Sequence, residues 1–232
     1  MKRAEIGLLC AGMASVLTWS SNAGAQAVVP QPPGDQRLET AYQAILTNAV
    51  VMKALEDVKA DDARTLDEQK RIVQIPAPPF KEGRRAEYFL KRMHELGLKD
   101  VSIDTEGNVI GIRKGTGGKP KLVISAHLDT VFPEGTDVTV KEKDGAILAP
   151  GIGDDSRGLA AVLSMLKAMN ENGLKTVGDV MFVGTVGEEE LGNLRGVKAL
   201  FRDHRTSTVS FPWTGSPSTA SSIRRPAATV TR

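Results

Sequence analysis

The stretch LVISAHLDT at residues 122–130 decides the fold, because it joins a buried strand to a pair of polar side chains. Its first part, Leu122 to Ser125, is a continuous apolar run that is typical of a strand covered on both faces. A second such run extends from Val180 to Val186. Helical patterns lie between and around these runs. We therefore predict an α/β fold: a three-layer sandwich with a mostly parallel central sheet flanked by helices.

The helical patterns are bounded by ordinary start and stop signals. The sequence TLDE at 65–68 has the form of a capping box, and the helix that it opens must end near Ile75, because prolines follow at once. Gly97 lies where a C-cap glycine belongs. We expect helices over 38–58, 65–75, 83–96, 157–170 and from 196 to 202, and short strands over 101–103 and 109–112.

The N-terminus has the pattern of a secretory signal peptide. Lys2 and Arg3 precede an apolar stretch, Ile6 to Leu17, and small residues follow at cleavage spacing around Ala25. The stretch is shorter than the ~20 residues that a membrane anchor needs. We therefore expect residues 1–27 to be removed and the mature chain to be exported, to the periplasm or to the outside of the cell.

Composition and charge limit the partners of the chain. Lysine and arginine number 30 and aspartate and glutamate 28, so the net charge is only +2. We therefore expect no nucleic-acid partner, and no membrane partner once the signal is removed. Loss of residues 1–27 also removes Cys10, the only cysteine. Any metal in the mature chain must then be held by histidine and carboxylate side chains.

Three polar motifs carry the candidate chemistry, and each also has an ordinary structural explanation. His127 and Asp129 suit a metal-bound imidazole that is oriented by a carboxylate or by the local backbone, but equally a surface hydrogen bond. Asp154 and Asp155 lie between glycines just before a helix, which one of them can cap. Glu188 to Glu190 are either a solvated loop or a metal ligand beside a general base. The first and third motifs follow buried strands, where the sites of parallel sheets lie.

The order of these motifs resembles the superfamily of di-zinc peptidases and deacylases that includes aminoacylase, carboxypeptidase G and peptidase T. The resemblance runs from about Leu66 to His204. Five segments carry it: IPAPPF at 75–80, DTEGNV at 104–109, AHLDTVFP at 126–133, Gly151 to Gly158, and Val186 to Gly196. It implies that residues 65–204 are the N-terminal part of a zinc-exopeptidase-like catalytic domain, preceded by a linker and a helix over 28–64.

The resemblance also implies a role for each polar residue. His127 and Glu189 correspond to ligands of the first and the second metal, and Asp154 to the carboxylate that bridges both. Glu188 corresponds to the general base on the bridging water, and Asp129 to the residue that orients His127. The lead-in TVG favours these two glutamates over the next one. The expected cofactor is Zn²⁺, two ions per site, with cobalt or manganese as alternatives.

The implied activity is metal-dependent hydrolysis of amide bonds. The resemblance favours an exopeptidase of the aminopeptidase or tripeptidase type, acting on short peptides with a metal-activated water. Deacylation of N-acyl amino acids is the alternative among enzymes, because the residues present do not separate the two substrates. The alternative of another class is an inactive fragment.

The chain departs from the family pattern after His204. The resemblance implies a later carboxylate, a late histidine and a smaller inserted dimerisation domain, and none of them has a counterpart in this sequence. Residues 205–232 are rich in Ser, Thr, Pro and Arg without a helical or strand period, so we expect a disordered tail or the product of a frameshift. With part of the ligand set unmatched, we expect weak metal binding and low or no activity.

Other charged residues are expected to have no role in the site. His94 lies in a helical stretch among polar residues and is predicted to be a surface histidine. His204 has no matching role. The basic residues of the same helical region are expected to form a solvated face: Lys81, Arg84, Arg85, Lys91 and Arg92.

Overall fold

The computed structural model describes residues 36–117, 119, 121–204 and 208–212. The chain divides into two compact units, Met1–Ala41 and Tyr42–Arg232, and the boundary falls inside α1 (Gln36–Leu46). Of the first unit, only the start of α1 is described, and the predicted signal peptide lies outside the described residues. None of the helices that are described is long and apolar enough to cross a membrane.

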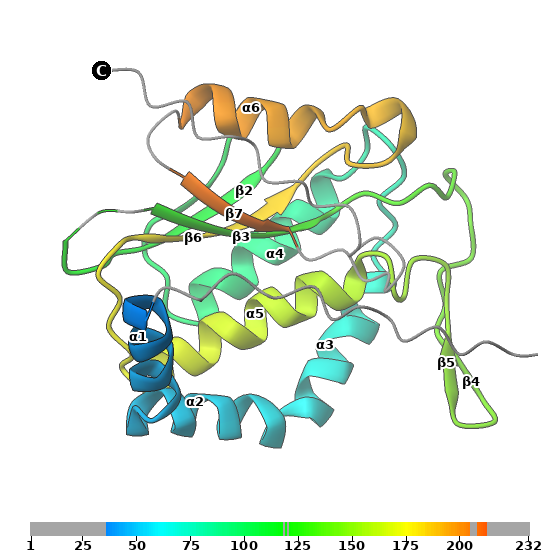
Figure 1. The fold of residues 1–232 in the computed structure, drawn as a ribbon. Helices are drawn as coiled ribbons and strands as arrows, with labels where there is room; N and C mark the ends of the chain where they lie inside the picture. The colour runs from blue at the N-terminus through cyan, green and yellow to red at the C-terminus, as the bar shows by residue number, and fades with distance from the viewer. Residues whose placement is uncertain (1–35, 118, 120, 205–207, 213–232) are drawn as a thin grey trace, which may run out of the picture. The chain divides into compact units, whose positions relative to one another are not determined.

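A five-stranded sheet forms the centre of the second unit (Figure 1). Its spatial order is β1 (Val101–Ile103), β2 (Val109–Arg113), β6 (Val180–Thr185), β3 (Lys121–His127) and β7 (Thr208–Pro212). β3 is parallel to β6 and β7, whereas β2 is antiparallel to β1 and β6. The α/β prediction is confirmed, but the sheet is mixed rather than mostly parallel. The turn after β1 is too short for a crossover, so β2 folds back beside it.

The helices form close to their predicted positions. Their bounds are α2 (Ala49–Ala60), α3 (Asp62–Val73), α4 (Gly83–Glu95), α5 (Ser156–Glu171) and α6 (Arg195–Asp203), with a 3₁₀ turn η1 (Glu190–Gly192). The single helix predicted over 38–58 is broken at Asn48, whose side chain accepts two backbone N–H groups and caps α2. The predicted capping box at Thr65 is wrong. Thr65 lies within α3 and donates to the carbonyl of Asp61, while Glu68 pairs with Arg92.

Helices cover both faces of the sheet, as the three-layer prediction requires. All of β6 is buried, and its alternate residues face opposite sides. Val180 and Phe182 belong to a core cluster with residues of α4 and α5, whereas Met181 and Val183 pack in a second cluster with Leu200 of α6. Figure 1 shows α4 and α5 on one side of the sheet and α6 on the other. The continuous apolar run in the sequence is therefore explained by burial on both faces.

A two-stranded hairpin outside the main sheet was not predicted. It consists of β4 (Lys141–Lys143) and β5 (Ala146–Leu148), which pair in the antiparallel sense. The turn residues Asp144 and Gly145 have φ of 53° and 78°. An Asp-Gly pair tolerates positive φ and is a strong hairpin signal, so the sequence did contain the information.

Part of the segment that was expected to be disordered is a strand. Thr208 to Pro212 form β7, which pairs in parallel with β3 from Lys121 to Ser125. The prediction of disorder is wrong for these five residues, because pairing with a neighbouring strand supplies the backbone hydrogen bonds that the local sequence does not reveal. The other residues after His204 lie outside the described ones.

The predicted solvated face of α4 is partly wrong. Lys81, Arg84 and Lys91 are exposed, but Arg85 is only 1% exposed, and Arg92 is half-buried against Glu68. The prediction treated the basic residues as one face, whereas adjacent residues of a helix, such as Arg84 and Arg85, point in directions about 100° apart. His94 is exposed and its ring Nδ1 lies 3.0 Å from the carbonyl oxygen of Leu98, so the prediction of a surface histidine is confirmed.

Candidate metal centre

His127 is the last residue of β3 and is nearly fully buried. Its backbone N–H donates to Asp155 Oδ2 at 3.1 Å. Its ring Nδ1 lies 3.0 Å from the backbone carbonyl oxygen of Asp129, and its Nε2 lies 2.8 Å from Asp154 Oδ1. An imidazole that donates from Nδ1 to a carbonyl presents the lone pair of Nε2 to a ligand. Both sides of the ring are thus fixed, and Nε2 points at the acidic cluster.

Asp154 and Asp155 differ in their contacts, and each fits one of the two roles that the sequence left open, helix capping and ligand binding. Asp155 is fully buried and caps α5 by accepting the N–H of Gly158 at 2.9 Å. Burial raises the pKa of Asp155 to about 7, against the opposing effects of His127 and of backbone hydrogen bonds. The side chain of Asp154 is 63% exposed, and its Oδ1 faces His127. One aspartate therefore supports the structure, and its neighbour is open to a ligand.

Asp129 joins the ends of two strands that are distant in sequence. Its carboxylate accepts the backbone N–H of Glu188 at 3.0 Å and of Glu189 at 2.9 Å. Burial alone would raise the pKa of Asp129, but hydrogen bonds from His127 and from these two N–H groups lower it below its ordinary value. Asp129 is thus an ionised carboxylate that fixes the loop after β6 against the end of β3.

Three side chains meet in a geometry that suits a cation. His127, Asp154 and Glu189 each offer one ligand atom, and these atoms lie within 4.8 Å of one another. Glu188 lies beside them, with Oε2 4.0 Å from His127 Nε2. Glu190 begins η1 and is exposed. The structure therefore brings together all five residues singled out in the sequence and leaves the third glutamate outside.

The electrostatics of this group fit a divalent metal. Burial raises the pKa of Glu189, and the neighbouring charges of Asp154, Glu188 and Asp129 raise it further. Burial alone would lower the pKa of His127, but Asp129, Asp155 and Asp154 raise it to about 10. Excess negative charge around one imidazole is the setting that a cation stabilises. One nitrogen and two carboxylate oxygens suit zinc and other divalent first-row metals.

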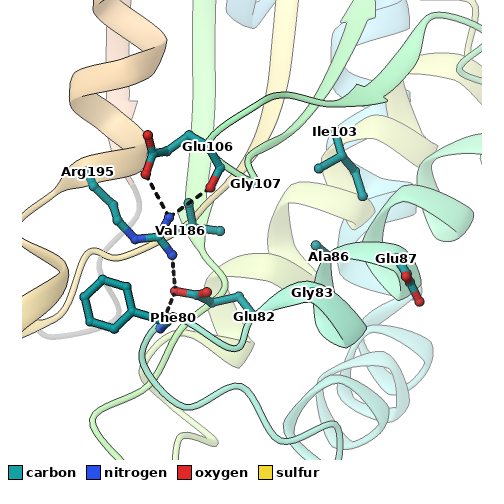
Figure 2. A pocket seen from close by; sticks show the side chains of 10 residues that line it. All are labelled: Phe80, Glu82, Gly83, Ala86, Glu87, Ile103, Glu106, Gly107, Val186 and Arg195. Carbon is teal, nitrogen blue, oxygen red and sulfur yellow. Dashed lines mark hydrogen bonds and ion pairs between the residues drawn. The ribbon is translucent and has the colours of Figure 1, made fainter.

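A second ionic network anchors the loop that carries the glutamates (Figure 2). Arg195, at the start of α6, contacts Glu82 Oε1 at 2.7 Å and Glu106 Oε1 at 3.0 Å, and its guanidinium lies 5.2 Å from the ring centre of Phe80. These residues line a cavity of about 320 Å³. A Cβ on Gly187 would lie 2.6 Å from Arg195 Cγ, so the side chain packs directly on the loop.

Sequence reasoning missed Arg195 and assigned no site contact to Asp155. The glycine at position 187, whose φ is 61° in the structure, is a sequence sign of a tight loop. The sequence contains no comparable sign for the arginine that packs on this loop. The bond from His127 N–H to Asp155 also could not be foreseen, because it links the end of β3 to the start of α5.

Comparisons with known proteins show similarity to peptidases. Residues 123–217 match the family model described as peptidase family M20/M25/M40. Carboxypeptidase G2 of Pseudomonas sp. (strain RS-16) is 31% identical over 94 residues, which are 40% of this chain and 22% of that protein.

Solved structures show the same catalytic-domain architecture. Aminopeptidase PepT of Bacillus cereus superposes with a TM-score of 0.56 at 28% identity, and a tripeptidase of Staphylococcus aureus with a TM-score of 0.53 at 30% identity. Each alignment covers 66% of this chain and 43% of the other. The chain thus spans less than half the length of these relatives.

Proposed function

We propose that this chain belongs to the M20 metallopeptidase superfamily and is a metal-dependent hydrolase that cleaves amide bonds of short peptides, on the support of its similarity to that family model and to the solved peptidases. The observation that carries the proposal is the meeting of His127, Asp154 and Glu189 within 4.8 Å, with Glu188 beside them. Zinc is the proposed metal, because an imidazole and two carboxylates form a ligand set that it accepts.

The chain's own residues divide the work. His127, Asp154 and Glu189 would hold a divalent metal, which would supply Lewis-acid activation of a water molecule and of the amide carbonyl. Glu188 lies beside these ligands, where it would accept the proton of the attacking water and deliver it to the leaving amine, as a general base that becomes a general acid. Asp129 fixes the backbones of Glu188 and Glu189, so that both carboxylates keep their places.

The proposed substrates are short peptides, cleaved from one end. The solved relatives include an aminopeptidase and a tripeptidase, and these names support an exopeptidase that acts on unblocked peptides. A carboxypeptidase is among the curated relatives. N-acyl amino acids are the second candidate, because they present the same amide to the same metal centre. An inactive fragment is the alternative that involves no catalysis.

The proposed location is outside the cytoplasm, by way of the signal sequence predicted over 1–27. The support is the charged start, the apolar stretch and the small residues that follow. N-terminal sequencing of the protein recovered from an expressing bacterium tests this point. A mature protein that begins after residue 27 supports export, and an intact Met1 contradicts it.

The test of function uses the purified chain after removal of metal with a chelator. Zinc is then titrated back while hydrolysis of a panel of tripeptides and N-acyl amino acids is measured. Zinc-dependent release of the terminal residue from tripeptides supports the proposal, and preference for N-acyl amino acids favours the deacylase. Zinc binding without hydrolysis of either panel would overturn the proposed activity in favour of the inactive alternative.

A further inference from the structure

Among the residues that the structure describes, Arg85 forms no ion pair with a carboxylate. It lies on α4, is 1% exposed, and its hydrogen bonds within this part of the chain all go to backbone carbonyl oxygens. The distances are 3.0 and 2.7 Å to Ile75, 2.8 Å to Leu128 and 3.5 Å to Val73. Burial lowers the pKa of Arg85 to about 10, and the nearby charge of Asp129 opposes this shift. Burying a charge with neutral partners is costly, so a specific benefit is expected.

The carbonyl of Leu128 leads directly into the metal centre. Leu128 lies between His127 and Asp129, and its carbonyl belongs to the peptide group that contains the N–H of Asp129. Its own N–H donates to the carbonyl of Thr185 on β6 at 2.7 Å. The backbone here is therefore held by β6 on one side of Leu128 and by Arg85 on the other.

The segment that follows α3 is bound to the same place. Arg85 donates a hydrogen bond to the carbonyl of Ile75. Two residues later, the carbonyl of Ala77 accepts hydrogen bonds from the N–H and the hydroxyl of Thr130, at 3.0 and 3.3 Å. The two neighbours of Asp129, Leu128 and Thr130, are thus both connected to residues 75–77, the first through Arg85 and the second directly. Asp129 in turn holds the N–H groups of Glu188 and Glu189.

We propose that Arg85 is a positioning residue of the metal centre. It orients the peptide between Leu128 and Asp129, and thereby the backbone from which the Asp129 carboxylate reaches the loop of Glu188 and Glu189. The effect on metal binding rests on the metal centre of the proposed function. The effect on the loop does not, because the hydrogen bonds to Asp129 exist without a metal.

A second arginine of the same helix provides a matched control. Arg92 is half-buried and makes a bidentate pair with Glu68, with hydrogen bonds of 2.8–3.0 Å. None of its hydrogen bonds or ion pairs reaches a residue of the metal centre. Replacing Arg92 disturbs the fold without touching the site, whereas replacing Arg85 disturbs both.

The experiment compares Arg85→Met, Arg85→Lys and Arg92→Met with the parent chain. The first measurement is the affinity for Co²⁺, followed by its visible absorption. The second is hydrogen exchange of the Glu188 and Glu189 amides in the metal-free protein. The lysine variant retains a cation, so the same two quantities can be measured on it if the methionine variant does not fold.

We expect Arg85→Met to weaken Co²⁺ binding by about 10–100-fold, the usual effect of removing an outer partner of a metal site. Exchange of both amides should become at least about tenfold faster, and lysine should restore part of each effect. Arg92→Met should leave both quantities within about twofold. Parent-like cobalt affinity and amide exchange in folded Arg85 variants would overturn the inference. Failure of the parent chain to bind cobalt would instead overturn the proposed metal centre, and amide exchange would still test Arg85.

Discussion

Two groups of charged side chains, each around one buried residue, have opposite charge balances in this protein. Around Glu68, whose side chain is 2% exposed, the carboxylate receives two nitrogens of Arg92 and the hydroxyl of Tyr88 at 2.7 Å. Around His127, the carboxylates of Asp154, Glu188 and Glu189 face one imidazole and one another. The first group is neutralised within the protein, whereas the second has an excess of acid.

This difference separates a structural cluster from a functional one. A buried carboxylate with bidentate arginine and hydroxyl partners needs nothing further, and it fixes α3 against α4. Carboxylates gathered around a single imidazole repel one another, so a cation that binds between them would be stabilised. The following predictions test that separation, from the largest expected effect to the smallest.

Replacing Glu188 by Gln should have the largest effect on turnover. The amide cannot accept a proton, so hydrolysis by the zinc-loaded protein should fall by about 10²–10⁴-fold while zinc affinity changes little. Steady-state rates and zinc titration measure the two quantities. Glu190→Gln is the control, because this neighbour is exposed and outside the cluster. Equal losses in both variants would contradict the role of Glu188.

Replacing Glu68 by Gln should have the largest effect on stability. It removes the bidentate partner of Arg92 and leaves that guanidinium with Glu95 alone, which costs about 3 kcal/mol in the free energy of unfolding. Urea denaturation measures this cost. Zinc affinity of the folded variant should remain that of the parent. A strong loss of zinc binding would show that the two clusters are coupled.

Replacing Asp129 by Asn should affect both stability and metal binding. The amide has one acceptor oxygen, so it cannot accept both the N–H of Glu188 and that of Glu189 from two oxygens as the carboxylate does. We expect a loss of about 1–3 kcal/mol in unfolding free energy and a clear loss of zinc affinity. Denaturation and zinc titration on the same preparation measure both. A variant that lost stability but kept its zinc affinity would show that Asp129 has a structural role only, like Glu68.

The smallest expected effect is a pH dependence of the metal-free protein. The pKa of His127 is raised from 6.5 to about 10, so the folded chain holds this proton more tightly than the unfolded chain. Its contribution to stability is complete below pH 6.5 and is lost as the pH rises towards 10. Because one of the acidic partners of His127, Asp154, is 63% exposed, solvent screens much of this effect, and we expect Tm to fall by only about 5 °C between pH 6.5 and 9.5.

Differential scanning calorimetry of chelator-treated protein measures this fall. Excess zinc should reduce it, because the ion replaces the proton on His127. His127→Asn should remove the part of the fall in Tm that comes from His127, whereas His94→Asn, at a surface histidine, should leave the fall unchanged. A Tm that is flat over this range in the metal-free parent would contradict the predicted state of His127.

Much of the fold followed from local patterns. The apolar runs that became β3 and β6, the proline stop after α3 and the glycine after α4 all act within a few residues of themselves. The parallel pairing of β3 with β6 also followed from the alternation of strands and helices. The antiparallel placement of β2 and the pairing of β7 did not, because strand neighbours depend on contacts far apart in sequence.

The same division holds within the site. The order of the motifs identified His127, Asp129, Asp154, Glu188 and Glu189 as a group through their resemblance to the di-zinc family. Two of the three motifs also follow strands whose ends meet at one edge of the sheet. Only the tertiary structure decided how they connect. Asp129 binds the backbone of the glutamates, Asp155 binds His127, and Arg85 is buried behind them. These contacts join segments that are distant along the chain, and only packing brings such segments within hydrogen-bonding distance.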